Sequence, residues 1–456
     1  MKNKMLSINP YNHETLASFD IDGQSEINNA IKESVNSYNH WKNVSLKERA
    51  GYMHKCGEVL RAKKEEYARL ISLEMGKVMK ESLAEIEKSA LICDYYGQHG
   101  EEFLAPKPLD VPEGKSYLAY DPLGPILAIM PWNFPFYQLF RFAPPTLMAG
   151  NTIILKHSSN VPQCSLAIEK CFSEAGLPQG VFKSMLIDSR SAMKVLEDKN
   201  IMGVSLTGSV GAGSKVGEIA GKHVKKSVLE LGGSDPFIVL EDADIQKASA
   251  TAAKSRMINC GQSCIAAKRF IVHADCYNIF RDQFIQHLEN MKFGNQLDEE
   301  TDYASLASKN LREELNRQIE GSIAKGAEIY WKKNGINSEE AFYPPMVLEN
   351  IKPGMPAYEE EIFGPVALFF KVNSENEAIE IANNTSFGLG ASIWSTDTEK
   401  AEKIARKIES GIIYINDLVA SKPEVPFGGV KKSGYGRELS FTGIREFVNE
   451  KTIWIK

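Results

Sequence analysis

The feature that most constrains the fold is the alternation of short apolar runs with helical segments after residue 122. The runs at 126–130 and 152–155 are almost entirely apolar, and amphipathic patterns at 161–175 and 190–198 separate runs of this kind. Apolar strands joined through helices are typical of a parallel sheet that is covered on both faces. A second alternating series begins at Phe237. The sequence therefore predicts an α/β protein that contains two such units.

Length, charge and hydropathy narrow the range of partners. A chain of 456 residues is too long for one core, so two or three domains are expected. The net charge is −6 and lysine and arginine form no dense cluster, which argues against a nucleic-acid partner. The apolar stretch from 123 to 155 is broken by five prolines and carries Arg141. It is a poor membrane span, and we expect no membrane partner.

Cysteine usage is typical of a reducing compartment. The seven cysteines form no CxxC motif and cannot all pair. We therefore expect neither a disulfide framework nor a metal site, and the cytoplasm is the simplest location.

Three residues that are far apart in the sequence supply complementary chemical groups. Cys264 ends the segment 259–264, which reads Asn-Cys-Gly-Gln-Ser-Cys. Glu230 lies in an apolar run before two glycines, and Asn133 lies between two prolines. Alone, these residues would be a buried structural thiol, an ion-pair partner and a turn residue. Together, a thiol, a carboxylate and a rigidly held amide are sufficient for covalent chemistry on a carbonyl group.

A nucleotide site is one of two interpretations of the segment after residue 206. Gly208 and Ser209 follow an apolar run and precede a helical pattern, where backbone N–H groups suit a phosphate. The spacing to Gly213 departs from GxGxxG, so a plain strand-to-helix turn stays open as the alternative. Lys156 follows the run at 152–155 and is either a ligand at the same sheet edge or a solvated cap.

The chain resembles the aldehyde dehydrogenase superfamily over nearly its whole length. The motifs that carry the resemblance are 131–135 (PWNFP), 206–209 (LTGS), 229–233 (LELGG), 259–264 (NCGQSC), 361–365 (EIFGP) and 426–429 (PFGG). The resemblance implies a doubly wound cofactor-binding domain, an α/β catalytic domain and a small bridging β oligomerisation element in a homodimer or homotetramer. The corresponding residues would be 1–105 with 123–232, then 233–432, and finally 106–122 with 433–456.

The resemblance also implies roles for the three chemical groups. Cys264 would attack an aldehyde to give a thiohemiacetal, and hydride transfer to NAD or NADP would leave a thioester. The Asn133 side chain and the Cys264 backbone N–H would hold the oxyanion. Glu230 would activate the water that releases the acid.

Further residues are implied to bind the cofactor. Lys156 would bind the adenosine ribose, and Gly208 and Ser209 the pyrophosphate. Glu361 would bind the nicotinamide ribose beside the aromatic residues Trp132 and Phe363. Members that prefer NAD often carry glutamate at the position of Ser159, where its charge repels a 2′-phosphate. The neutral hydroxyl of Ser159 therefore predicts that NADP is accepted alongside NAD.

Arg141 is the candidate for substrate selection. It lies eight residues after Asn133, so in a helix both side chains could face one cavity. Its guanidinium could bind a carboxylate, and a subunit contact is the alternative. The chain resembles succinate semialdehyde dehydrogenases, which have an arginine here. It departs from some of them at Ile258, where they carry a second carboxylate-binding arginine.

The predicted reaction is therefore the oxidation of succinate semialdehyde to succinate. Glutarate semialdehyde, a broad range of aldehydes and transfer of the acyl group to coenzyme A are the enzymatic alternatives, although Glu230 argues against the last. A nucleotide-binding scaffold without turnover is the non-enzymatic alternative. Cys260 is interpreted as a packing residue, and a reversible Cys260–Cys264 disulfide is a second hypothesis.

Overall fold

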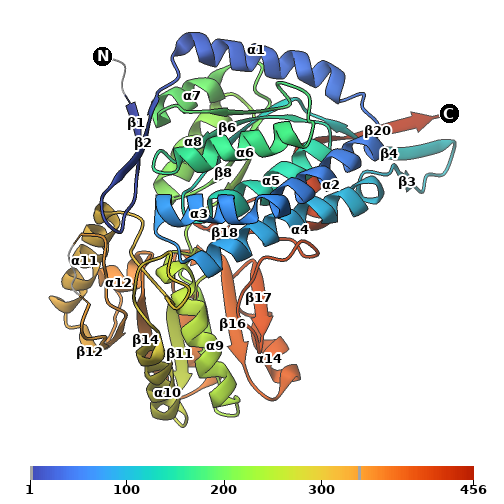
Figure 1. Ribbon diagram of the computed structural model, residues 1–456. Helices are drawn as coiled ribbons and strands as arrows, with labels where there is room; N and C mark the ends of the chain where they lie inside the picture. Colours follow the sequence, from blue (N-terminus) through green and yellow to red (C-terminus); the bar gives the residue numbers. More distant parts are fainter. Residues whose placement is uncertain (1–3, 337–339) are drawn as a thin grey trace.

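The computed structural model describes residues 4–336 and 340–456, which form two α/β lobes and a projecting arm (Figure 1). The N-terminal lobe is built around a six-stranded sheet whose neighbouring strands are parallel, except at the β19 edge. The strand order is β19 (Gly434–Tyr435), β9 (Lys226–Glu230), β8 (Gly203–Thr207), β5 (Pro125–Met130), β6 (Thr152–His157) and β7 (Phe182–Met185).

Helices cover both faces of this sheet, because successive side chains of its strands point to opposite faces. Ile126 and Ala128 belong to one buried cluster, whereas Leu127 belongs to another. The first cluster is shared with α2 (Leu46–Ala62), α3 (Lys64–Met75), α4 (Met79–Phe103), α5 (Pro135–Met148) and α6 (Pro162–Glu174). The second is shared with α1 (Gln24–Trp41), α7 (Ser189–Glu197) and α8 (Val210–Lys222). The predicted doubly wound arrangement is confirmed.

The C-terminal lobe contains a seven-stranded sheet with its own core, in which only the β12–β13 pair is antiparallel. Its order is β12 (Glu328–Lys332), β13 (Met346–Glu349), β14 (Val366–Val372), β11 (Arg269–His273), β10 (Pro236–Val239), β16 (Gly390–Trp394) and β17 (Ile412–Ile415). Its helices are α9 (Ile245–Met257), α10 (Tyr277–Asn290), α11 (Lys309–Ile323), α12 (Pro356–Glu359), α13 (Glu375–Asn383) and α14 (Thr398–Ala405).

The arm is a three-stranded sheet in the order β20 (Val448–Ile455), β4 (Lys115–Pro122) and β3 (Lys107–Leu109), and the C-terminus lies at its end (Figure 1). The three strands of the arm lie within the predicted bridging element, residues 106–122 and 433–456. The same predicted element also contains β19, which pairs with β9 at the edge of the N-terminal sheet. The short helix α15 (Ser440–Ile444) also packs against α4 and α5 of that lobe.

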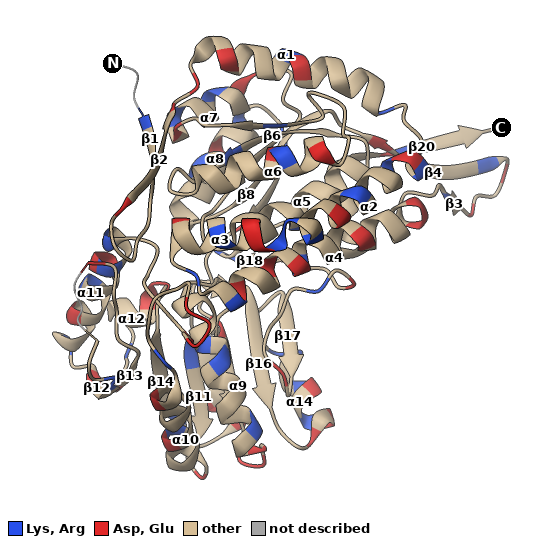
Figure 2. Ribbon diagram, in the orientation of Figure 1, with Lys and Arg blue, Asp and Glu red and all other residues tan. Residues whose placement is uncertain are grey.

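Two small antiparallel pairs complete the fold: β1 (Lys4–Ile8) with β2 (Thr15–Asp20), and β15 (Phe387–Gly388) with β18 (Val430–Lys431). The apolar stretch from 123 to 155 forms β5, α5 and β6 inside the N-terminal lobe. Among the residues that the structure describes, no helix is long and apolar enough to cross a membrane. Acidic and basic residues are interspersed along the outer helices of both lobes (Figure 2).

Candidate active site

Cys264 lies in a tight loop between α9 and β11. The loop begins with a short 3-10 turn, η1 (Ile258–Gly261), in which Asn259, Cys260 and Gly261 have φ angles of 53°, 52° and 75°. A Cβ atom on Gly261 would lie 2.4 Å from the Gly364 carbonyl group, so only glycine fits there. A turn with consecutive left-handed residues is costly and persists only when its surroundings hold it.

Buried charged side chains hold this loop. Lys268 Nζ donates to the carbonyl oxygens of Ser263, Cys264 and Ala266 at 3.0, 2.9 and 3.2 Å. The same ammonium group lies 3.5 Å from the Glu361 carboxylate. Lys268 therefore links the loop that carries the thiol to a predicted cofactor-binding residue.

Asn133 lies between β5 and α5, and its main chain is fixed from two directions. Its carbonyl oxygen accepts hydrogen bonds from Lys77 Nζ and Asn259 Nδ2, both at 2.8 Å. Its own Nδ2 donates to the Gln262 carbonyl oxygen at 3.1 Å, which uses one of two N–H bonds. Within residues 4–336 and 340–456, the Cys264 backbone N–H has no acceptor. An amide N–H and a backbone N–H are thus available beside the thiol.

Cys264 lines two cavities. The first, of about 250 Å³, is called the Glu361 cavity here and is also lined by Trp132, Asn133, Gly208, Ser209, Glu361 and Phe363. The second, of about 150 Å³, is called the Arg141 cavity and is also lined by Lys88, Tyr137, Arg141, Ile258, Val419 and Ser421. Gln138 borders both. One thiol therefore stands at the junction of two separate binding spaces.

The Glu361 cavity has the features of a phosphate and ring site. The Ser209 side chain caps α8 by accepting from Ala212 N at 3.3 Å. Among the described residues, the N–H groups of Ser209, Val210 and Gly211 have no acceptor, as is usual for a helix start. A Cβ on Gly208 would meet nothing closer than 3.6 Å, so the approach to these groups is open. The rings of Trp132 and Phe363 meet edge to face, and their centroids lie 5.8 Å apart. A pyrophosphate and an aromatic ring fit these elements.

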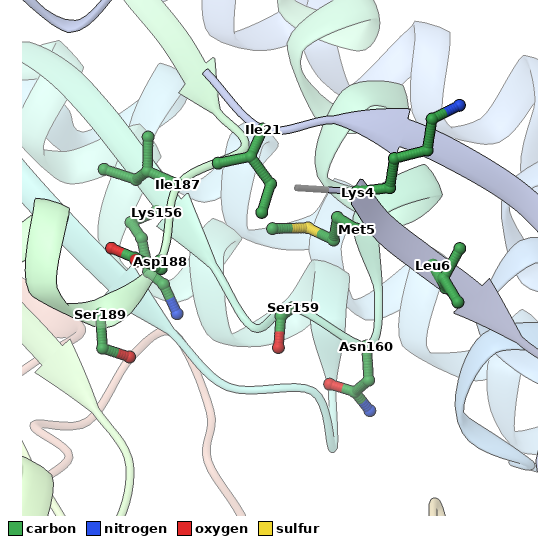
Figure 3. Close-up of a pocket in the computed structure, with 10 residues that line it drawn as sticks. All are labelled: Lys4, Met5, Leu6, Ile21, Lys156, Ser159, Asn160, Ile187, Asp188 and Ser189. Atoms are coloured by element: carbon green, nitrogen blue, oxygen red, sulfur yellow. The ribbon is translucent and has the colours of Figure 1, made fainter. Parts of the chain in front are cut away.

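Lys156 and Ser159 line a third cavity of about 410 Å³, called the Lys156 cavity (Figure 3). The side chains of Lys156 and Asp188 lie beside each other in it, and Ser159 comes from the loop after β6. Burial lowers the pKa of Lys156, and the charge of Asp188 opposes this effect. The cavity is at the carboxyl-terminal edge of the six-stranded sheet, which also carries Gly208.

Arg141 is buried in α5, 2% exposed, and points into the cavity named after it. Its Nε donates to the carboxylate of Glu438, and its guanidinium stacks 4.2 Å from the ring centroid of Phe427. Among the described residues, its buried Nη2 has no hydrogen-bond partner. A second carboxylate in the cavity could bind this free nitrogen.

Glu230 ends β9 but lines neither of the cavities that Cys264 borders. Both of its carboxyl oxygens are buried and have no hydrogen-bond partner in the part of the chain that the structure describes, and a Cβ on Gly428 would lie 2.7 Å from Oε1. Burial, with the nearby charge of Glu438, raises the pKa of Glu230 well above its usual range. The structure thus holds a carboxyl group of high proton affinity behind the site, not in it.

The thiol itself is protonated at neutral pH in this arrangement. Burial raises the pKa of Cys264 to about 12, although the positive charges of Arg141 and Lys268 act in the opposite direction. Cys260 faces elsewhere: its Sγ donates to the Ala304 carbonyl oxygen at 3.5 Å, in the core of the C-terminal lobe. Cys264 packs instead against the core of the N-terminal lobe. This geometry argues against a Cys260–Cys264 disulfide unless the loop rearranges.

Comparison with known proteins identifies the family. Residues 1–453 match the model of the aldehyde dehydrogenase family. The chain belongs to this family. It is 44% identical over 449 residues to a probable NADP(+) succinate-semialdehyde dehydrogenase of Synechocystis sp., covering 98% of this chain and 99% of that protein. It is 43% identical over 453 residues to the NADP(+) succinate-semialdehyde dehydrogenase of Mycobacterium avium, covering 98% of this chain and 96% of that protein.

Solved aldehyde dehydrogenase structures agree with this assignment. The succinic semialdehyde dehydrogenase of Streptococcus pyogenes, solved in complex with NADP+, superposes with a TM-score of 0.97 at 38% identity over 99% of both chains. The succinate-semialdehyde dehydrogenase of Burkholderia pseudomallei superposes with a TM-score of 0.96 at 31% identity, covering 99% of this chain and 94% of that one. The fold and the family predicted from the sequence are therefore confirmed.

Several residues around the site of this aldehyde dehydrogenase were not predicted. Glu438 pairs with Arg141, and Lys268 binds the loop that carries Cys264. Lys77 forms a buried ion pair with Glu85, whose carboxylate accepts from Phe136 N at the start of α5. The sequence contains these charges in helical or loop segments without a local motif, so only their burial in the folded chain distinguishes them.

Proposed function

We propose that this aldehyde dehydrogenase oxidises succinate semialdehyde to succinate with NADP or NAD as hydride acceptor. The observation that carries the proposal is the position of Cys264 at the junction of the Glu361 cavity and the Arg141 cavity. A substrate whose aldehyde reaches Cys264 can extend its other end toward Arg141. The printed names of the relatives from Synechocystis and Mycobacterium specify the same substrate with NADP(+).

In the first step, the Cys264 sulfur would attack the aldehyde carbon and form a thiohemiacetal. Because the resting thiol is protonated, the sulfur must release its proton to water as the carbon–sulfur bond forms, and the electron pair of the carbonyl π bond moves to the oxygen. The free N–H groups of the Asn133 amide and the Cys264 backbone would bind the oxygen that gains negative charge. One such donor contributes about 3–4 kcal/mol to stabilisation of the transition state.

Loss of hydride from the same carbon would convert the thiohemiacetal to a Cys264 thioester, and the nicotinamide supplies the hydride acceptor. Glu230 would then activate the water that hydrolyses the thioester to succinate and the free thiol. Since Glu230 lines neither cavity, this role requires its side chain to turn toward Cys264. Hydrolysis by this route needs no coenzyme A.

We propose that the cofactor extends along the sheet edge from the Glu361 cavity to the Lys156 cavity. Glu361, Trp132 and Phe363 would contact the nicotinamide half, and Gly208 and Ser209 the pyrophosphate. Lys156 and Ser159 would face the adenosine ribose. No glutamate faces that ribose from position 159, so a 2′-phosphate would meet the ammonium group of Lys156 without a neighbouring repulsion from this position.

We further propose a homodimer or homotetramer assembled through the arm. The strand β20 is the edge of its sheet, with Trp454 and Ile455 54% and 49% exposed, and such edges tend to pair. The predicted domain bounds, with residues 106–122 and 433–456 as the bridging element, are part of this proposal. All seven cysteines are free, which supports the proposed location in a reducing cytoplasm.

The proposal is tested by NAD(P)H formation with succinate semialdehyde, glutarate semialdehyde and butanal, with each cofactor in turn. We expect succinate semialdehyde to have the highest kcat/KM and Arg141→Ala to remove its advantage over butanal. Equal kcat/KM for succinate semialdehyde and butanal in the unmodified enzyme would contradict the proposed substrate and favour a broad-range enzyme. NADH or NADPH formation that depends on coenzyme A would contradict the hydrolytic step.

A further inference from the structure

Lys88 is a second cation in the Arg141 cavity. It lies on α4, and it lines the cavity together with Arg141, Ile258 and Cys264. Its Nζ donates to Ser421 Oγ at 3.0 Å and lies 4.2 Å from the centroid of the Tyr137 ring. A hydroxyl group and an aromatic face hold an ammonium group in place but do not neutralise it.

The charges around the cavity show why this lysine differs from Arg141. Arg141 is paired with the Glu438 carboxylate, so the pair carries no net charge. Within the described residues, Lys88 has no carboxylate within ion-pair distance. The acidic residue that acts on it through space, Glu85, is paired with Lys77. A partly buried cation without a counter-ion is unfavourable unless an anion binds.

We propose that Lys88 binds the substrate carboxylate together with Arg141 and supplies the net positive charge of the cavity. This inference rests on the proposed function and deepens it. Ile258, at the position where some succinate semialdehyde dehydrogenases carry a second arginine, lines the same cavity without charge. Lys88 reaches that space from α4 instead. A carboxylate between the two cations would accept from Lys88 Nζ and from the free Nη2 of Arg141.

The inference predicts that the KM for succinate semialdehyde depends on pH. Burial, with the positive charge of Arg141, lowers the pKa of Lys88 to about 8, while Glu85 acts in the opposite direction. The other groups that face Lys88 are the Tyr137 ring and the Ser421 hydroxyl, and Cys264 borders the same cavity. Lys88 is charged below this pKa and neutral above it. The KM for succinate semialdehyde should therefore rise as pH increases through about 8, and the KM for butanal should not follow it.

The test compares Lys88→Met and Lys88→Arg with the unmodified enzyme, using succinate semialdehyde and butanal. We expect Lys88→Met to lower the ratio of kcat/KM for succinate semialdehyde to that for butanal by about 10- to 100-fold, the range for a hydrogen bond to a charged group. The loss should lie in KM, and Lys88→Arg should restore most of the ratio. Lys55→Met is the matched control, because Lys55 also lies over a tyrosine ring, at 5.9 Å from Tyr52, but outside the cavity.

Calorimetric binding of succinate separates this inference from the proposed function. Weaker succinate binding by Lys88→Met, with folding unchanged by circular dichroism, would support the role of Lys88 even if succinate semialdehyde is not the preferred substrate. An unchanged substrate ratio and unchanged succinate binding in Lys88→Met would overturn the inference and leave the aldehyde oxidation intact. An equal loss of kcat/KM with both aldehydes would also overturn it, because it would indicate a structural role.

Discussion

The two cavities that meet at Cys264 are built from different parts of the chain. The Glu361 cavity combines the turn after β8 and the start of α8 with the side chains of Trp132, Glu361 and Phe363. The Arg141 cavity is lined by two long cationic side chains, Lys88 from α4 and Arg141 from α5, together with residues 418–421 and the loop that carries Cys264. Backbone N–H groups at a helix start suit any phosphate, whereas charged side chains can be exchanged singly. Binding of the cofactor and selection of the aldehyde should therefore respond to different substitutions.

The largest effect on kcat is expected from substitution of Cys264, where the two cavities meet. Cys264→Ala should lower kcat by about 10⁶-fold, the scale on which loss of a nucleophile reduces covalent catalysis. The variant keeps both cavities, so calorimetry should show NADP and succinate binding close to those of the unmodified enzyme. Residual turnover within tenfold of the unmodified rate would show that another residue is the nucleophile and that the two cavities do not meet at the reacting group.

Asn133→Ala tests whether the Asn133 amide acts as the proposed oxyanion donor and not in substrate selection. We expect kcat to fall by about 10²–10³-fold, because the developing oxyanion loses one hydrogen bond. The ratio of kcat/KM for succinate semialdehyde to kcat/KM for butanal should stay constant, since both aldehydes form the same oxyanion. Steady-state kinetics with both substrates measures this. A change confined to the KM of one aldehyde would indicate that the amide contacts the substrate chain instead.

Glu438→Gln tests the charge pair on the Arg141 side. Removing one partner of a buried ion pair leaves an uncompensated charge and should lower the free energy of unfolding by about 3–5 kcal/mol. Urea denaturation followed by fluorescence gives this value. Glu218→Gln is the control, because Glu218 and Lys215 form an exposed pair, 67% and 60% exposed, whose loss should leave the free energy of unfolding almost unchanged. Equal effects of the two substitutions would contradict the buried pairing.

Ser159→Glu tests the adenosine end of the proposed cofactor site and has the smallest expected effect. A second carboxylate in the Lys156 cavity, added to that of Asp188, should lower kcat/KM for NADP by about tenfold, equivalent to about 1.4 kcal/mol, and leave NAD less affected. Ser159→Ala, which removes the hydroxyl group without adding charge, is the control. The ratio of kcat/KM for succinate semialdehyde to kcat/KM for butanal should stay constant in both variants. A loss of equal size with NAD and NADP would show that position 159 does not face the 2′-phosphate.

The same contrast explains what could be predicted from the sequence. The strands of the N-terminal sheet and the turn at Gly208 depend on local patterns of apolar residues and glycine, so the α/β fold was predicted correctly. The family was predicted correctly from the motifs that resemble it. The pairing of Arg141 with Glu438 joins positions 297 residues apart, and Lys88 meets Ser421 across 333. No local pattern marks such pairs. The high pKa of Cys264 was also not predicted, because it comes from burial in the assembled fold.

The most direct test of the central claim is peptide mass spectrometry of Glu230→Gln after reaction with succinate semialdehyde and NADP+. The account predicts one equivalent of NADPH per protein chain and a succinyl group on Cys264, because the thioester forms but is not hydrolysed. Repeated turnover without a succinyl group, or a succinyl group on any other residue, would contradict the account.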